Sequence, residues 1–201
     1  MNINIIEEKY GFSSALSKRV KTEYIVLHHS VGCGTPQSIH TSHLKAGYVG
    51  IGYHFYIRKN GKIYRGRPID VIGAHCLNYN DKSVGVCFEG NFEKEKMTEK
   101  QKTSGKELLN YLKKLYPNVY VKRHKDLNAT LCPGKNFCFE EIVEGKTLKK
   151  ELTSANDIIW ELKNGALKIS INDVSGAVFA LEAAQKAESP LYWILRKIVN
   201  K

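Results

Sequence analysis

The feature that most constrains this fold is a polar run, residues 124–134, that holds an imidazole and a thiol eight positions apart at His124 and Cys132. Zinc accepts neutral imidazole nitrogen and thiolate sulfur, and a catalytic zinc site takes three protein ligands and leaves a fourth position open. The third ligand must come from elsewhere, and residues 24–30 carry two histidines, His28 and His29, to the end of a predicted strand. Successive strand side chains point to opposite faces, so one of this pair can face the site. A histidine and a cysteine that merely pack in a protein core would give the same His-x7-Cys pattern. The surrounding sequence must therefore decide between a metal site and ordinary core residues.

Composition indicates a globular chain: 201 residues, 42% hydrophobic and 25% charged, are enough for one sizeable core and a small second unit. The five cysteines are an odd number without regular spacing, so at least one is free, and we expect most to be reduced core thiols. The first residues lack the pattern of a secretory signal, and no apolar run approaches membrane-spanning length. We therefore expect a protein made in the cytoplasm, without membrane contact, that acts elsewhere only if another agent releases it.

Charge favours an anionic partner, since 31 Lys and Arg against 20 Asp and Glu give a net charge of +11. Residues 153–201 hold six basic and five acidic side chains, so nearly all of the excess lies upstream. Nucleic acid, an anionic cell-wall polymer, an acidic substrate and a merely solvated lysine surface all fit this balance. No nucleic-acid motif or repeated aromatic and basic pattern accompanies the charge, so we do not expect nucleic-acid binding.

Strands and helices alternate along residues 1–150 without strict βαβ regularity, which predicts an α/β fold with a mixed central β-sheet flanked by helices. Strand signals lie at 24–29, 50–58, 62–65, 83–89 and 119–121, and helix signals at 35–46, 98–116 and 139–150. The Asn60-Gly61 pair predicts a hairpin between the second and third strands. Alternation in the fourth strand places Glu89 on the face of Gly85 and Cys87, opposite the apolar face.

Residues 153–201 differ in character and predict a small helical domain of three short helices, near 155–163, 172–186 and 189–199. A segment this short is close to the lower limit for independent stability, so docking on the domain of residues 1–150 or self-association would stabilise it. The alternative is a helical extension that completes the main core.

Five motifs together resemble one known family. They are Tyr-Ile-Val-Leu-His-His-Ser (24–30), Gly-Tyr-His-Phe (52–55), Gly-Ala-His (73–75), Ser-Val-Gly-Val-Cys-Phe-Glu-Gly-Asn-Phe (83–92) and His124 through Cys132-Pro133-Gly134. In this order and spacing they resemble the type-2, zinc-dependent N-acetylmuramoyl-L-alanine amidases, a family that includes phage lysozyme-amidases and animal peptidoglycan-recognition proteins. The likeness spans residues 20–145. Residues 153–201 resemble the C-terminal modules of clostridial phage endolysins, which implies cell-wall binding.

The resemblance implies a Zn²⁺ site and a substrate cleft. Its zinc ligands correspond to His28, His124 and Cys132, and His29 becomes a neighbour. Tyr53 corresponds to a tyrosine beside the metal, where a phenol can donate a hydrogen bond to a developing oxyanion. Its alternative role is to fill the core.

The cleft is implied by three further positions. Thr130 stands where some phage members have lysine, so this position offers a hydroxyl contact instead of a cation. His75 and Asn80 correspond to the segment that lines the cleft. By contrast, we expect His40, His43 and His54 to have capping, surface or packing roles.

The residue types suit amide hydrolysis on their own account. Zinc with two neutral imidazoles and one thiolate keeps a net positive charge and an open position, so it can activate water and polarise a carbonyl. An acid–base group must then move a proton to the leaving amine. Glu89 is the candidate for this catalytic role, and the alternative is a solvated or salt-bridged carboxylate.

The sequence therefore predicts a zinc-dependent peptidoglycan hydrolase that cleaves the amide between the lactyl group of N-acetylmuramic acid and the L-alanine of the stem peptide. As a phage endolysin or bacterial autolysin it would act on the cell wall after release, with peptidoglycan and anionic wall polymers as partners. The alternative is a non-catalytic peptidoglycan-recognition protein. Such relatives typically lack the metal cysteine, so the presence of Cys132 favours catalysis.

Overall fold

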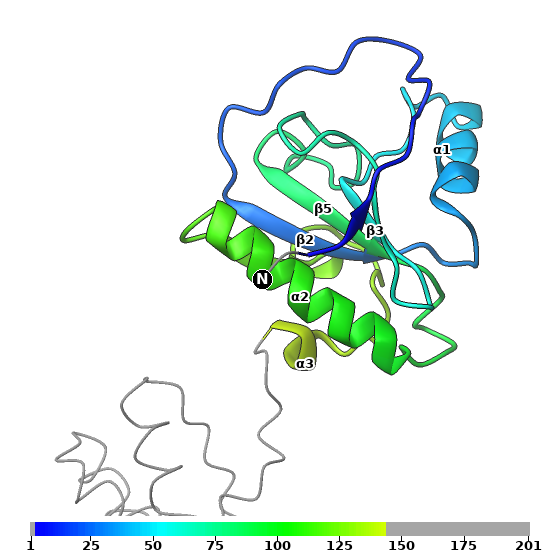
Figure 1. Ribbon diagram of the computed structural model, residues 1–201, viewed down its shortest axis with the longest axis vertical. Helices are drawn as coiled ribbons and strands as arrows, with labels where there is room; N and C mark the ends of the chain where they lie inside the picture. The colour runs from blue at the N-terminus through cyan, green and yellow to red at the C-terminus, as the bar shows by residue number, and fades with distance from the viewer. Residues whose placement is uncertain (1–2, 144–201) are drawn as a thin grey trace, which may run out of the picture. The chain divides into compact units, whose positions relative to one another are not determined.

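A computed structural model describes residues 3–143, which form a six-stranded mixed sheet with the strand order β1-β4-β3-β5-β2-β6 (Figure 1). The strands are β1 (Ile5–Ile6), β2 (Tyr24–His29), β3 (Phe55–Ile57), β4 (Ile63–Arg65), β5 (Ser83–Phe88) and β6 (Tyr120–Arg123). The helices are α1 (Pro36–Lys45), α2 (Glu99–Leu115), α3 (Phe139–Val143) and the short 3₁₀ turn η1 (His124–Asp126). This architecture confirms the predicted mixed sheet flanked by helices.

The middle of the sheet is parallel. β2 pairs in parallel with β5 on one side and β6 on the other, and β3 pairs in parallel with β5. The hairpin predicted at Asn60-Gly61 joins the antiparallel pair β3 and β4, with Gly61 at a φ of 83° that favours glycine. Because β2 and β6 run in the same direction, their carboxyl ends meet at one edge of the sheet, where ligands of open α/β sheets commonly bind.

β5 is buried along its whole length because both faces of this central strand are covered. Val84, Val86 and Phe88 belong to the main core, and Cys87 lies on the other face, as the alternation predicts. The strand ends at Phe88, so Glu89 lies just beyond it.

The helices begin where their capping residues predict. Thr35 accepts a hydrogen bond from the Ser38 N–H at the start of α1, and Thr98 forms a reciprocal capping box with Gln101 at the start of α2. The leucines of α2 at positions 108, 109 and 112 are buried in the main core against the sheet. In Figure 1, α2 and α3 lie together and α1 lies apart from them.

The predicted elements are wrong at two places. No strand was predicted before residue 24, but Ile5–Ile6 form β1, which pairs in parallel with β4. Two residues are too few to show the alternation of apolar and polar side chains that marks a strand in the sequence. The strand predicted at 50–58 begins only at Phe55, because the backbone at Gly52 forms a hydrogen bond with a loop instead of with a neighbouring strand. The Ala74 N–H donates to the Gly52 carbonyl, and a Cβ at Gly52 would lie 1.9 Å from the Ala74 oxygen.

Two predictions fall partly or wholly beyond the described residues. The helix predicted at 139–150 is described only as α3, and the helical domain predicted at 153–201 lies outside. Within residues 3–143, no helix is both long and apolar enough to cross a bilayer.

Candidate metal centre

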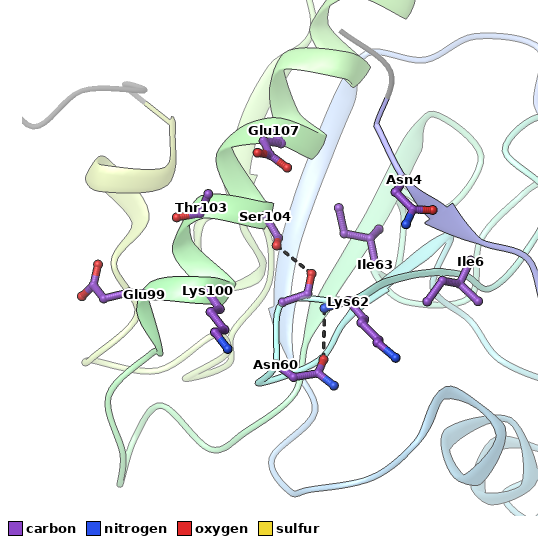
Figure 2. A pocket seen from close by; sticks show the side chains of 11 residues that line it. Asn4, Ile6, Asn60, Lys62, Ile63, Glu99, Lys100, Thr103, Ser104 and Glu107 are labelled. Atoms are coloured by element: carbon purple, nitrogen blue, oxygen red, sulfur yellow. Dashed lines mark hydrogen bonds between the residues drawn. The ribbon is translucent and has the colours of Figure 1, made fainter.

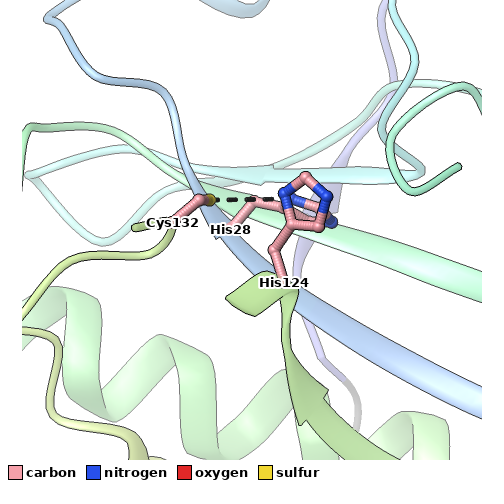
Figure 3. Close-up of side chains that lie close together, drawn as sticks. All are labelled: His28, His124 and Cys132. Carbon is pink, nitrogen blue, oxygen red and sulfur yellow. Dashed lines mark hydrogen bonds between the residues drawn. The ribbon is translucent and has the colours of Figure 1, made fainter. Parts of the chain in front are cut away.

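Two neighbouring parallel strands bring His28 and His124 together. His28 lies near the carboxyl end of β2, and His124 follows β6 directly as the first residue of η1. The register pairs Leu27 with Arg123, so the next residues of both strands are the two histidines. Cys132 returns from the following loop, and Figure 3 shows the three side chains pointing toward one another. Their ligand atoms all lie within 4.8 Å of one another.

This donor set fits zinc. Bond lengths of about 2.0–2.3 Å in a tetrahedron separate donor atoms by roughly 3.3–3.8 Å, and His28 Nδ1 lies 3.8 Å from Cys132 Sγ. Burial, with neighbouring His124 and His29, holds the pKa of His28 well below its ordinary value. Burial also lowers the pKa of His124, although a hydrogen bond to the Asn128 side chain opposes this shift. Both imidazoles are therefore neutral at pH 7, which is the form that binds metals.

The Cys132 thiol needs a cation in order to ionise at neutral pH. Burial raises its pKa to about 11, although the His29 N–H, 3.4 Å from Sγ, opposes this shift. A divalent cation between Cys132 and the two histidines would supply the missing positive charge. The His29 ring points elsewhere, as predicted for a neighbour, since its Nδ1 accepts from the Phe92 N–H at 3.2 Å.

A cavity of about 580 Å³ opens beside the metal ligands and includes His124 in its wall. Four residues predicted from the sequence line it: Tyr53, His75, Asn80 and Thr130. The remaining lining residues are His43, Tyr48, Ala74, Cys76, Leu77, Asn128 and Ala129. The structure thus gathers all the predicted site residues except Glu89 around the metal ligands and this cavity.

Tyr53 lies against the metal ligands, with its ring centroid 5.3 Å from that of His28. Burial, followed by the nearby Cys87 and Cys132 thiols, raises the pKa of Tyr53 well above its ordinary value. The phenol is therefore protonated across the physiological pH range, and its hydroxyl lies within hydrogen-bond reach of the Cys87 thiol.

Asn80 and Thr130 shape the loops around the cavity. The Asn80 side-chain oxygen accepts from the backbone N–H groups of His75 and Cys76, at 2.7 and 2.9 Å. The Thr130 hydroxyl accepts from the Cys132 N–H at 3.2 Å, so it braces the loop that presents the thiol. Both residues hold the site in place as well as lining the cavity.

Glu89 is engaged elsewhere. Its carboxylate forms an ion pair with Arg58, with one oxygen 3.1 Å from Nε and the other 3.2 Å from Nη2. It also accepts from the N–H groups of Lys59 and Gly34. It does not line the cavity. This geometry supports the salt-bridged alternative for Glu89 over the acid–base role, and the physical reason is that the strand ends one residue before it.

Several residues near the site were not predicted as site residues, and three of them have contacts of interest. Cys87 is the register partner of His28 in β5, and its thiol lies beside the Tyr53 hydroxyl. Asn128 lines the cavity and accepts from the Cys76 thiol at 2.9 Å. His43, predicted as a capping, surface or packing residue, also lines the cavity while its Nδ1 accepts from the Gly52 N–H. Only the position of Cys87 could have been found from the sequence, by aligning β5 with β2.

A second hollow of about 500 Å³ lies between the β3–β4 hairpin and α2 (Figure 2). Its wall is held by the Ser104 hydroxyl, which donates to the Gly61 carbonyl at 2.7 Å, and by the Lys62 N–H, which donates to the Asn60 side chain at 3.0 Å. None of the predicted site residues lines this hollow.

Comparison with known proteins identifies the family. The profile of the N-acetylmuramoyl-L-alanine amidase family matches residues 18–135. The chain belongs to this amidase family. The match contains all three metal-ligand candidates and the whole cavity wall, which confirms the resemblance found in the sequence.

Individual relatives of this amidase include enzymes and recognition proteins. The solved structure of the amidase LysC from Clostridium intestinale URNW is 45% identical, with a TM-score of 0.70, and the match covers 72% of this chain and 97% of LysC. The peptidoglycan-recognition protein SC2 of Drosophila melanogaster is 34% identical, covering 66% of this chain and 81% of that protein. The endolysin of Klebsiella phage KP32 is 32% identical, covering 59% and 84%.

Because Glu89 forms an ion pair with Arg58, we expect its replacement to change the stability of the protein and not the rate of hydrolysis. Burial alone would raise the pKa of Glu89, but the hydrogen bonds from Arg58 and from the Lys59 and Gly34 N–H groups outweigh it and hold the pKa below its ordinary value. We expect Glu89→Gln to lower the free energy of unfolding by about 2 kcal/mol at pH 7, because Arg58 loses its buried partner.

Denaturant unfolding of both chains across pH measures this effect. A depressed folded pKa contributes stability above the unfolded value of about 4.3, and this contribution is lost as the pH falls through the folded pKa. The difference between the two chains should therefore shrink below pH 4. Hydrolysis at pH 7 should change less than about threefold, and a tenfold slower reaction in a fully folded variant would restore the acid–base role.

Proposed function

We propose that this chain is a zinc-dependent N-acetylmuramoyl-L-alanine amidase that hydrolyses bacterial peptidoglycan at the amide between the lactyl group of N-acetylmuramic acid and L-alanine. The observation that carries the proposal is the convergence of His28, His124 and Cys132 within 4.8 Å beside a large cavity. Membership of the amidase family and 45% identity with a clostridial amidase support the same reaction.

The chain's own residues would hold the metal and orient the substrate. His28, His124 and Cys132 would bind Zn²⁺, which when bound supplies the Lewis acidity that activates water and polarises the amide carbonyl. Tyr53, protonated and with its ring beside that of His28, would turn its hydroxyl from Cys87 to donate a hydrogen bond to the carbonyl oxygen as that oxygen gains negative charge. In the balanced reaction the oxygen of water joins the carbonyl carbon, the carbon–nitrogen bond breaks, and the proton leaves with the new amino terminus of L-alanine.

The cavity supplies the binding surface for the stem peptide. Its wall combines the hydroxyl of Thr130, the amides of Asn80 and Asn128, and the rings of His43 and Tyr48. These groups can both donate and accept hydrogen bonds, which suits a peptide backbone beside a sugar.

The proposed setting is that of an endolysin or autolysin. Relatives named endolysins support action on the cell wall after release from the cytoplasm. The net charge of +11 supports attraction to anionic wall polymers alongside peptidoglycan. The wall-binding role and self-association predicted for residues 153–201 stay predictions.

A recognition protein without hydrolysis is the second candidate, favoured by the 34% identity with a peptidoglycan-recognition protein. The complete set of ligand-type side chains at the cavity supports hydrolysis instead. Digestion of purified peptidoglycan, with and without a chelator, separates the two. We expect mass spectrometry to show free lactyl groups and new L-alanine amino termini, and a chelator to abolish both. Binding to the wall without any cleavage, in the presence of zinc, would establish the recognition role.

Replacing the thiolate tests the metal ligands. We expect Cys132→Ala to weaken zinc binding by more than about hundredfold and to abolish cleavage. The loss should exceed that from removing a residue that only hydrogen-bonds to a ligand, which costs roughly tenfold to hundredfold in affinity. Cys138→Ala is the matched control, since Cys138 is another half-buried free cysteine outside the metal cluster. Zinc content and product release are measured on both chains. Full activity with stoichiometric zinc in Cys132→Ala would refute the ligand assignment.

Removing one hydroxyl tests Tyr53. We expect Tyr53→Phe to keep zinc and lower kcat about hundredfold, because the phenol donates to charge that develops in the transition state. Tyr120→Phe, at an exposed position on β6, is the control and should leave kcat unchanged. An equal rate for both variants would show that Tyr53 only fills space.

A further inference from the structure

The two ring nitrogens of His28 have different partners. Nδ1 lies 3.8 Å from Cys132 Sγ, and Nε2 lies 3.0 Å from His75 Nδ1. The His28 side chain is 1% exposed, so water does not compete for either nitrogen. An imidazole binds a metal through a nitrogen that carries no proton, so a ligand role through Nδ1 requires the proton on Nε2.

We infer that His75 is a positioning residue for the metal centre: it accepts the His28 Nε2–H and so holds His28 Nδ1 bare and aimed at Cys132 and His124. The inference rests on the proposed function, because it assigns His75 a task toward the zinc that those residues would bind. Metal-binding histidines usually donate their second N–H to a carboxylate, a backbone carbonyl or water. Here a second imidazole, that of half-buried His75, occupies that place.

The direction of this hydrogen-bond chain is fixed at its far end. The Ser83 hydroxyl lies 2.6 Å from the Tyr79 carbonyl, which can only accept, so the hydroxyl donates to it. The Ser83 oxygen is then free to accept from His75 Nε2–H, at 3.4 Å. A neutral His75 with its proton on Nε2 has a bare Nδ1, and this nitrogen accepts from His28.

The surroundings of His75 hold its ring in one place. Two glycines leave room for the ring, because a Cβ at Gly73 would lie 2.4 Å from His75 Cδ2 and one at Gly85 would lie 2.5 Å from it. The glycines of two sequence motifs, Gly73 in Gly-Ala-His and Gly85 in Val-Gly-Val, thus both make room for the His75 ring, which lies between the loop and β5.

Two variants of similar size test the role. His75→Asn keeps an acceptor oxygen near the position of Nδ1, whereas His75→Leu removes every acceptor. We expect His75→Leu to raise the zinc dissociation constant by about tenfold to hundredfold, and His75→Asn to restore it to within about threefold of the original chain. Competition with a chromophoric chelator, on the full chain without peptidoglycan, measures this constant. Cobalt in place of zinc adds a thiolate-to-metal absorption band that reports the geometry at Cys132.

A matched control separates packing from positioning. His40 is a buried histidine on α1, and its ring, like that of His75, has hydrogen-bond partners on both nitrogens: the Ile51 N–H and the Gly11 carbonyl. We expect His40→Leu to lower stability without changing zinc affinity or the cobalt band. Should the His75→Leu chain fail to fold, His75→Gln decides in its place, because its carbonyl reaches toward the Nε2 position and leaves His28 without an acceptor.

The outcomes are distinct. Unchanged zinc affinity in the variant without an acceptor would overturn the inference, and so would an equal loss in His75→Asn and His75→Leu, which would show a packing role only. Failure of the original chain to bind zinc at all would overturn the proposed function itself. Tight zinc binding that depends on the acceptor at position 75 supports both.

Discussion

The parallel pairing of β2 with β5 and β6 is the constraint on which the rest of the structure depends. It places His28 next to Cys87 on one side, and next to the backbone that carries His124 on the other. A slip of one residue in this register would turn His28 to the opposite face of the sheet and separate the two imidazoles. The buried apolar residues of β5 and α2 resist such a slip, because it would also expose the core. Core packing therefore positions the metal ligands.

The same strand pairing brings several polar side chains into surroundings with little water, which costs free energy unless they form hydrogen bonds. Three imidazoles, a phenol and two thiols lie in largely buried surroundings on one face of the sheet, where unpaired polar groups are expensive. The structure offsets this with single, directed partners: His28 with His75, His75 with Ser83, and the Cys132 sulfur with the His29 N–H. His28 Nδ1 and the Cys132 sulfur are left facing each other at 3.8 Å, at the candidate metal position. Burial thus fixes both the protonation states and the directions of the side chains.

Local signals in the sequence were sufficient for most of the helices and strands, but not for the candidate metal ligands. Thr35-Pro36, Asn60-Gly61 and Thr98 mark a helix start, a hairpin and a second helix start by backbone chemistry that acts within a few residues, and all three predictions are confirmed. The prediction for His28, His124 and Cys132 needed the order of motifs, since residues so far apart show no local pattern. The structure brings these three together.

What the sequence could not show depends on where strands end and how loops return. Alternation placed Glu89 and Cys87 on one face, but only the register shows that Cys87, and not Glu89, lies beside His28. The predicted substrate role of His75 came from its motif, whereas its contact with His28 arises because the loop before β5 folds back over Gly85. β1 is missing from the prediction because two residues gain their strand geometry only from pairing with β4.

The candidate metal ligands and most of the cavity wall come from different parts of the fold. This separation allows one fold to occur both in enzymes and in proteins that only bind peptidoglycan. His28 and His124 are fixed by strand ends, while Asn80, Thr130 and His43 stand on loops and a helix that keep their own hydrogen bonds. A chain of this fold without the thiol of Cys132 would therefore retain the wall that contacts a peptide. The relatives of this chain include both an amidase and a peptidoglycan-recognition protein, as such a separation allows. In this chain the candidate metal ligands and the cavity occur together, and they share the residue His124.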